Sequence, residues 1–194
     1  MNGDAIQLVS KALEDLLNAA LAKQSIQGGV FVGPLDDPEA NGHAAVLFLY
    51  RVAVNADLRN SEHRVPAAVD DDPPVIHQGA LPLDLYYLLT GGTAQTGGER
   101  DTGLRVLGYV MQALNSTPNL AGISVQGELV RLTLDPVSSE EMSRIWTLFP
   151  TANYRTSVVY LASPVWIDPV SSRLPAPPVR QEPHRIGHVR RSEV

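Results

Sequence analysis

Apolar residues recur along the chain at two periods, and each period predicts a different kind of element. After Asp4, a candidate helix N-cap with Gln7 in capping-box spacing, apolar side chains return every three or four residues until Gln27-Gly28-Gly29. This spacing predicts one face of a helix, formed by Ile6, Val9, Leu13, Leu16, Leu17 and Ala20. The same period predicts a second helix with Leu104, Leu107, Met111 and Leu114 in line, and a third after Ser138 with Met142, Ile145, Trp146 and Phe149.

Five shorter stretches have the alternating or continuous apolar pattern of β-strands. They are residues 29–32, 44–54, 81–89, 128–134 and 156–167. The first half of 44–54 is apolar on both faces, which predicts a central strand covered from two sides. Pro164 predicts a bend in the last strand.

These elements predict an α/β fold: a single mixed β-sheet of about four to five strands with three helices packed on it. From Asp168 onward, prolines lie among arginines and histidines, with too few large apolar residues to build a core. We therefore expect one domain over residues 1–168 and an extended C-terminal arm over residues 169–194. Residues 55–79 carry three prolines and little periodicity, and a loop of that length is usually functional or becomes ordered on a partner.

The net charge of −6 is unevenly distributed. Residues 1–169 carry ten basic and nineteen acidic side chains, whereas residues 170–194 carry five arginines and two glutamates. The arm therefore has a charge of about +3 on a body of about −9. Opposite charges predict attraction between arm and body, within one copy or between copies.

No segment has the pattern of a signal peptide or a membrane span. Residues 1–4 lack the basic residues and the apolar run of a leader, and the longest apolar run, 44–50, is far shorter than the roughly 18 residues of a transmembrane helix. The absence of cysteine excludes disulfides, thiolate metal sites and cysteine nucleophiles, and it is consistent with a reducing compartment. We expect a soluble protein.

Candidate chemistry is weak throughout the sequence. Four acids, Asp57, Asp70, Asp71 and Asp72, could be combined with His63 and His77 into a metal or hydrolytic site. Such a site needs ligands fixed by rigid elements, and a proline-rich loop without ligand spacing favours a solvated acidic loop instead. The glycine-rich stretch 91–98 matches no phosphate-binding motif, and no serine lies in a nucleophile-elbow context. We therefore predict no catalytic, cofactor or metal residues, and a protein that is not an enzyme.

The segment after the strongest strand is a better candidate for recognition. Asn55 and Asp57 are typical turn formers, which bond to nearby backbone. That role leaves Arg59 unexplained, and its planar guanidinium suits a carboxylate on the same or a neighbouring subunit. We predict a protein interface that includes Arg51, Asn55, Asp57, Arg59 and Asn60, with Arg180, Arg185, Arg190 and Arg191 of the arm.

Three blocks of the sequence resemble the cap or tail-terminator proteins of extracellular contractile injection systems, of the Photorhabdus virulence cassette and antifeeding prophage type. The first block is Leu47-Phe48-Leu49-Tyr50-Arg51-Val52, running into Asn55 and Leu58-Arg59-Asn60. The second is Leu81-Pro82-Leu83-Asp84-Leu85-Tyr86-Tyr87-Leu88-Leu89-Thr90. The third is Arg105-Val106-Leu107-Gly108 with Met111-Gln112-Ala113-Leu114. The resemblance extends over about residues 5 to 167, and residues 55–79 and the arm depart from the family pattern.

The resemblance implies a structural cap that forms a hexameric ring, ends polymerisation of the inner tube and sheath, and anchors the terminal sheath layer. It implies assembly in the cytoplasm and then a place in a cytoplasmic or released particle. Tube and sheath subunits and further copies of the chain are the expected partners, with no cofactor and no nucleic acid. Two alternatives remain open at this point: another completion or baseplate subunit of such a particle, or an adaptor whose basic arm binds nucleic acid or anionic membranes.

Overall fold

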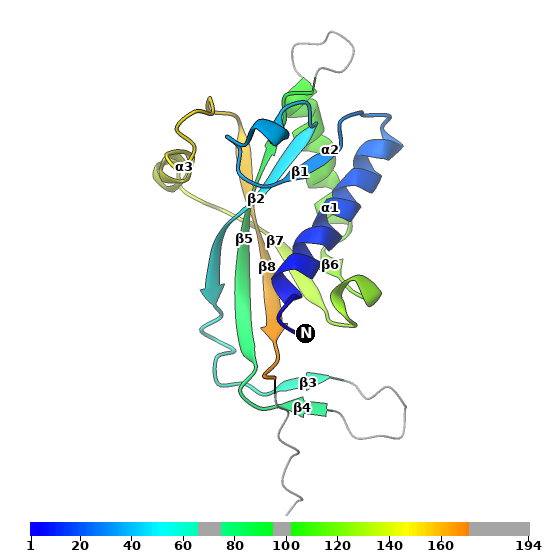
Figure 1. The fold of residues 1–194 in the computed structure, drawn as a ribbon, viewed down its shortest axis with the longest axis vertical. Helices are drawn as coiled ribbons and strands as arrows, with labels where there is room; N and C mark the ends of the chain where they lie inside the picture. Colours follow the sequence, from blue (N-terminus) through cyan, green and yellow to red (C-terminus); the bar gives the residue numbers. More distant parts are fainter. Residues whose placement is uncertain (66–74, 95–101, 171–194) are drawn as a thin grey trace, which may run out of the picture.

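The computed structural model describes residues 1–65, 75–94 and 102–170. A six-stranded sheet in the order β1-β2-β5-β8-β7-β6 lies between two layers of helix (Figure 1). The strands are β1 (Val30–Val32), β2 (Ala45–Val54), β5 (Leu81–Gly91), β6 (Asn119–Leu120), β7 (Val130–Asp135) and β8 (Ser157–Ile167). Because β1 runs parallel to β2 and the other neighbours are antiparallel, the sheet is mixed, as the sequence predicts.

The sheet has more strands than predicted, and the prediction of four to five is wrong. The additional strand, β6, has two residues, and an element that short has no period to detect. A separate two-stranded sheet, β3 (His63–Val65) and β4 (Val75–His77), lies within the region expected to be a long loop. Short strands of this kind are specified by their partners more than by their own sequence.

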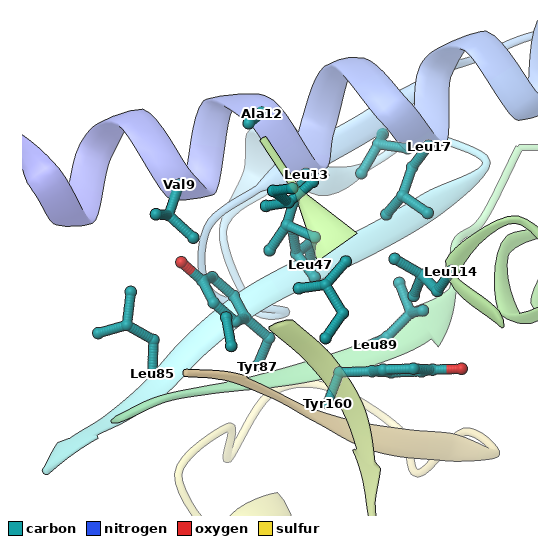
Figure 2. Packing of buried hydrophobic residues seen from close by; sticks show 14 of the residues in the cluster. Val9, Ala12, Leu13, Leu17, Leu47, Leu85, Tyr87, Leu89, Leu114 and Tyr160 are labelled. Atoms are coloured by element: carbon teal, nitrogen blue, oxygen red, sulfur yellow. The ribbon is translucent and has the colours of Figure 1, made fainter. Parts of the chain in front are cut away.

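Two helices cover one face of the sheet. They are α1 (Ala5–Lys23) and α2 (Thr102–Ser116), which contact each other and the central strands. Figure 2 shows the resulting core, in which Val9, Leu13 and Leu17 of α1 lie over Leu47, Tyr87 and Leu89 of the sheet. The long apolar face of α1 and the alternating pattern of β5 therefore meet in one buried cluster.

Two details of these helices differ from the prediction. The Asp4 side chain makes no capping bond to α1; its carboxylate accepts from the Asn2 amide at 3.3 Å instead. In α2 the buried face passes through Val106 and Val110, and Leu104 is 55 % exposed. The predicted apolar face of α2 is therefore correct at Leu107 and Leu114 but wrong at Leu104, where Val106 faces the core instead.

The third helix, α3 (Ser139–Trp146), covers the opposite face. The Ser138 hydroxyl accepts a bond from the Glu141 backbone N–H at 3.1 Å and so caps the helix, which confirms its predicted start after Ser138. Its apolar side joins a second cluster that contains Val46, Leu88, Ile145, Trp146, Phe149 and Val159. Since the start of β2 contributes to both clusters, its predicted burial from two sides is confirmed, although β2 lies next to the edge strand β1 and not at the centre.

The segment after β5 and the loop before β2 approach each other closely. Two 3₁₀ turns, η1 (Pro38–Ala40) and η2 (Ile123–Val125), lie in the connections. Gly92 donates its backbone N–H to Ala44 at 2.6 Å, and a Cβ at position 92 would lie 2.0 Å from the His43 carbonyl oxygen. Only glycine fits there, so the start of the glycine-rich stretch 91–98 is packed against the loop before β2. Residues 95–98 lie outside the described part of the chain.

Candidate assembly surfaces and a buried charge cluster

The turn after β2 is fixed to the sheet by Asn55. Its side-chain oxygen accepts from the Leu58 backbone N–H at 3.0 Å, which confirms the predicted turn-forming role. Its amide donates to Asp84 at 2.9 Å and to Ser163 at 3.2 Å, and the Ser163 hydroxyl also donates to Asp84. Asn55 thus ties β2, β5 and β8 together and orients the turn that follows.

The remaining residues of the predicted interface in this region are exposed. Arg51 lies with its guanidinium carbon 4.8 Å from the centre of the Tyr86 ring, a cation–π contact on the neighbouring strand. Asp57, Arg59 and Asn60 lie in the turn, and none of them makes a hydrogen bond or ion pair with another residue among 1–65, 75–94 and 102–170. Their side chains are accessible to a partner. Arg180, Arg185, Arg190 and Arg191 lie outside the described residues.

Beside this turn, no strand among the described residues pairs with the outer edge of β2 beyond Leu47. β1 pairs with β2 over residues 45–47, whereas β2 continues to Val54 along β5. Val52 and Val54 are 46 % and 47 % exposed. An edge that exposes apolar side chains and free backbone groups is a place where another strand can add.

A second surface lies beside α3 on the opposite face. A hollow of about 620 Å³ is lined by Ser138, Met142, Trp146, Tyr154 and neighbouring residues of the segments that flank α3. The Trp146 indole N–H has no hydrogen-bond partner in the described structure, and Tyr154 is 67 % exposed. The hollow mixes apolar and hydrogen-bonding groups without a catalytic arrangement.

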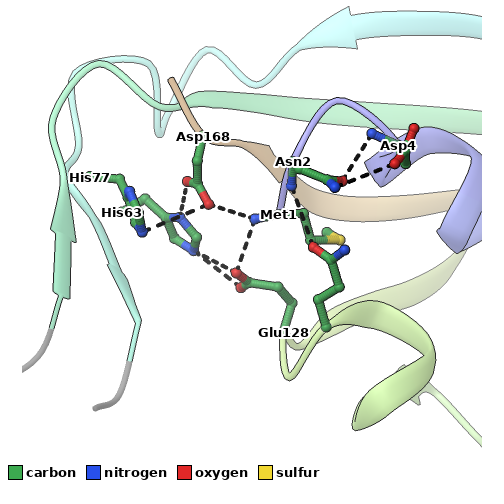
Figure 3. Close-up of polar contacts among 8 residues, drawn as sticks. Met1, Asn2, Asp4, His63, His77, Glu128 and Asp168 are labelled. Carbon is green, nitrogen blue, oxygen red and sulfur yellow. Dashed lines mark hydrogen bonds and ion pairs between the residues drawn. The ribbon is translucent and has the colours of Figure 1, made fainter. Parts of the chain in front are cut away.

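Charged groups from four separate segments converge at the end of β8, where Figure 3 shows them grouped around one imidazole. His63 of β3 is 4 % exposed, and its ring is stacked on Trp166 with centroids 4.6 Å apart and planes at 9°. Its Nδ1 lies 2.6 Å from Asp168 Oδ1, and its Nε2 lies 3.0 and 3.1 Å from the two Glu128 oxygens. We call His63, His77, Glu128, Asp168 and the Met1 ammonium the His63 cluster.

The other two members of the cluster lie beside the Asp168 carboxylate. The Met1 ammonium lies 2.7 Å from Asp168 Oδ2 and 3.4 Å from Glu128 Oε1. His77, the residue opposite His63 in the β3–β4 pair, places Nε2 3.9 Å from Asp168 Oδ2. Burial acts to raise the pKa of Asp168, but the hydrogen bonds from the Met1 ammonium and from His63 outweigh it and hold that pKa below its ordinary value.

The cluster contains residue types that bind metals. Ligand atoms of His63, Glu128 and Asp168 lie within 4.8 Å of one another. Both ring nitrogens of His63 already face carboxylate oxygens, however, and the Met1 ammonium occupies the space beside the same two carboxylates. The contacts therefore make an ion-pair cluster and not a preformed metal site.

The sequence analysis considered two members of the cluster, His63 and His77, as candidates for a metal or hydrolytic site. His63 and His77 were considered with Asp57, Asp70, Asp71 and Asp72, but Asp57 lies in the exposed turn and the other three acids are outside the described residues. Glu128 and Asp168 are 51 or more positions from either histidine in sequence. No local spacing connects them, so only the fold reveals the cluster.

The exposed turn, the outer edge of β2 and the His63 cluster lie toward the same end of the sheet, and the hollow beside α3 does not. Val54 is opposite Leu83 and Leu81 is opposite Ile167, so β2 ends where β5 begins and β8 ends. Figure 1 shows the β3–β4 pair beyond this end. The accessible turn, the unpaired edge and the base of the arm thus belong to one region of the molecule.

Among the described residues, no helix is long and apolar enough to cross a membrane.

Solved structures with a similar fold include a sheath/tube terminator and a tube-terminating cap. The PVC sheath/tube terminator of an extracellular contractile injection system, in its extended state, matches 100 % of this chain and 67 % of its own chain, at 21 % identity and a TM-score of 0.65. The tube-terminating cap of the anti-feeding prophage matches 90 % of this chain and 58 % of its own, at 19 % identity and a TM-score of 0.57. A search of curated proteins finds no significant sequence match.

The fold is therefore of a class found in terminator and cap proteins of contractile injection particles. The chain belongs to the Pvc16 N-terminal domain family, whose model matches residues 8–181. It spans about two thirds or less of the length of the two similar structures.

Proposed function

We propose that this protein is a subunit of the terminal cap of a contractile injection particle, where it ends growth of the tube and sheath. The observation that carries the proposal is membership of the Pvc16 N-terminal domain family over residues 8–181. The agreement in fold with a sheath/tube terminator over the whole chain supports it. The kinship with capping proteins also supports a structural role without catalysis.

A cap has a definite geometric requirement. Stacked rings present the same interface at every layer, so growth stops only when a subunit offers one complementary face and no second one. A hexameric ring of this chain on the last layer would meet that requirement. We assign the cap to the end distal to the baseplate, after assembly in the cytoplasm.

The described surfaces fit such a role in two ways. The exposed turn with Asp57, Arg59 and Asn60 carries both signs of charge, and Arg59 has the geometry to bind a carboxylate of the next copy in a ring. The unpaired edge of β2 can accept a strand from a neighbour. We propose that this end of the sheet forms the contacts of the ring.

The arm has a different proposed partner. Residues 170–194 carry five arginines against two glutamates, opposite to the charge of the body. We propose that Arg180, Arg185, Arg190 and Arg191 dock on the terminal sheath layer, and that this contact anchors the layer to the cap. Nucleic acid and membranes are not needed for this role.

The position of the chain in assembled particles tests the proposal. Particles purified from a producing strain and reconstructed by electron cryomicroscopy should show a ring of this chain on the last tube and sheath layer, away from the baseplate. Density for the chain at the baseplate would assign it to the alternative, a baseplate or completion subunit. A particle without the chain at either end would contradict both assignments.

A further inference from the structure

The two nitrogens of the His63 ring face two different carboxylates. Nδ1 lies 2.6 Å from Asp168 and Nε2 lies 3.0 Å from Glu128. A neutral imidazole has one N–H donor and one lone pair, so it can donate to one carboxylate only. Its lone pair would then point at the oxygen of the other. A ring that carries both protons is the form that donates in both directions.

The charges around His63 are consistent with the doubly protonated ring. The groups that face it are Asp168 after β8, Glu128 after η2, the Met1 ammonium before α1 and His77 of β4, with the apolar Trp166 against its face. Two carboxylates are balanced by the ammonium and one imidazolium. A buried cluster of zero net charge costs less than one with an uncompensated carboxylate.

The cluster connects the β3–β4 pair, the end of β8 and the start of the chain. β3 and β4 contact each other, and His63 and His77 bring the pair to the end of β8 through Trp166 and Asp168. The Asp168 backbone N–H donates to the Met1 carbonyl at 2.7 Å, which fixes the same point to the start of the chain. Loss of the His63 contacts would release the β3–β4 pair before the rest of the fold.

We propose that the His63 cluster is a pH-sensitive clasp, in which the doubly protonated His63 ring holds the β3–β4 pair against the end of β8 and loss of one proton releases it. The attachment is present while the ring carries both protons and is lost as the pH rises and the ring gives one up. It is also lost as the pH falls through the lowered pKa of Asp168, because the carboxylate then becomes neutral. The clasp is therefore closed between these two limits.

The inference concerns the isolated protein and does not depend on the proposed cap function. If the cap function holds as well, the clasp sets how the base of the arm is presented to the sheath. A clasp that works in a protein absent from particle ends would separate the two claims.

The test uses the full chain labelled with ¹⁵N at histidine. In mildly acidic solution both His63 nitrogens should have the chemical shifts of protonated nitrogen, and one should lose its proton as the pH rises. Hydrogen exchange of the β3 and β4 amides that pair the two strands, corrected for intrinsic pH dependence, should accelerate at least about tenfold over the same step, because a charge-assisted hydrogen bond is lost.

Two variants sharpen the test. Glu128→Gln supplies an amide donor that can bond to an unprotonated Nε2, so the exchange step should shrink or disappear. His43→Gln, a histidine outside the cluster, should leave the step unchanged. A neutral His63 tautomer in mildly acidic solution, or exchange of the β3–β4 amides that is independent of pH after correction, would overturn the proposal.

Discussion

Replacing Tyr87 by alanine is expected to lower the free energy of unfolding by about 4 kcal/mol. The ring is fully buried at the centre of the sheet, beneath Val9 and Leu13 of α1 (Figure 2). Burial raises the pKa of the Tyr87 hydroxyl to about 12, against the opposing effect of its bond to Ser10. Deleting the ring leaves a cavity between α1 and the sheet, and the cavity cannot close unless both layers move. Urea unfolding measures the decrease in the free energy of unfolding.

The matched variant is Tyr87→Phe, which keeps the ring and removes the hydroxyl. Ser10 lies 2.8 Å from that hydroxyl and also donates to the Ile6 carbonyl at 2.8 Å, so it keeps a partner. The expected loss is therefore only about 1 kcal/mol. Equal losses in the two variants would show that the hydroxyl, and not the packing of the ring, carries the stability of this site.

Ending the chain after Val170 is expected to abolish firm attachment of the cap while leaving the body folded. The two apolar clusters lie within residues 1–167, and the truncation keeps Asp168 with its His63 and Met1 partners. The midpoint of urea unfolding should not change. The fraction of sheaths that keep a cap should fall at least about tenfold, because every copy in the proposed ring would lose its proposed arm contact at once.

Two variants with the same change in net charge separate the effect of the arm's arginines from the effect of net charge alone. Glutamine at Arg180, Arg185, Arg190 and Arg191 should weaken capping as the truncation does. Added salt should weaken capping by the wild-type chain, because it screens the same charges. Glutamine at four exposed cations of the body, Lys11, Lys23, Arg131 and Arg144, makes the same change in net charge and should have little effect. Normal capping by the truncated chain would remove the arm from the account.

The main layers of the fold were predictable because their residues carry the signal locally. The step of three and four residues placed α1 within one residue of its observed start, and the alternation in 81–89 found β5. The apolar residues at Met142, Ile145 and Trp146 predicted the side of α3 that packs on the sheet. Each of these patterns repeats enough times in one segment to be read without its neighbours.

The missed features depend on contacts between distant segments. The β3–β4 pair joins His63 to His77 across a proline-rich loop, and β6 has two residues held by β7. The start of α2 was misjudged because Leu104 is apolar but exposed, and a surface patch has the same one-dimensional pattern as a core face.

The turn after β2 and the His63 cluster also combine features that were predictable from local sequence with features that depend on the fold. The turn-forming role of Asn55 followed from its residue type and is confirmed by its bond to Leu58, whereas its links to Asp84 and Ser163 needed the alignment of three strands. The partner expected for Arg59 stays a prediction about a neighbouring subunit. The His63 cluster had no local signature beyond two histidines within a single loop.

The length of the particles tests the central claim most directly, that this chain ends the growth of tube and sheath. In a producing strain from which the gene has been deleted, electron micrographs should show sheaths of widely varying and extended length, and expression of the full chain should restore one narrow distribution. Particles of normal, uniform length that stay extended without this protein would contradict the account.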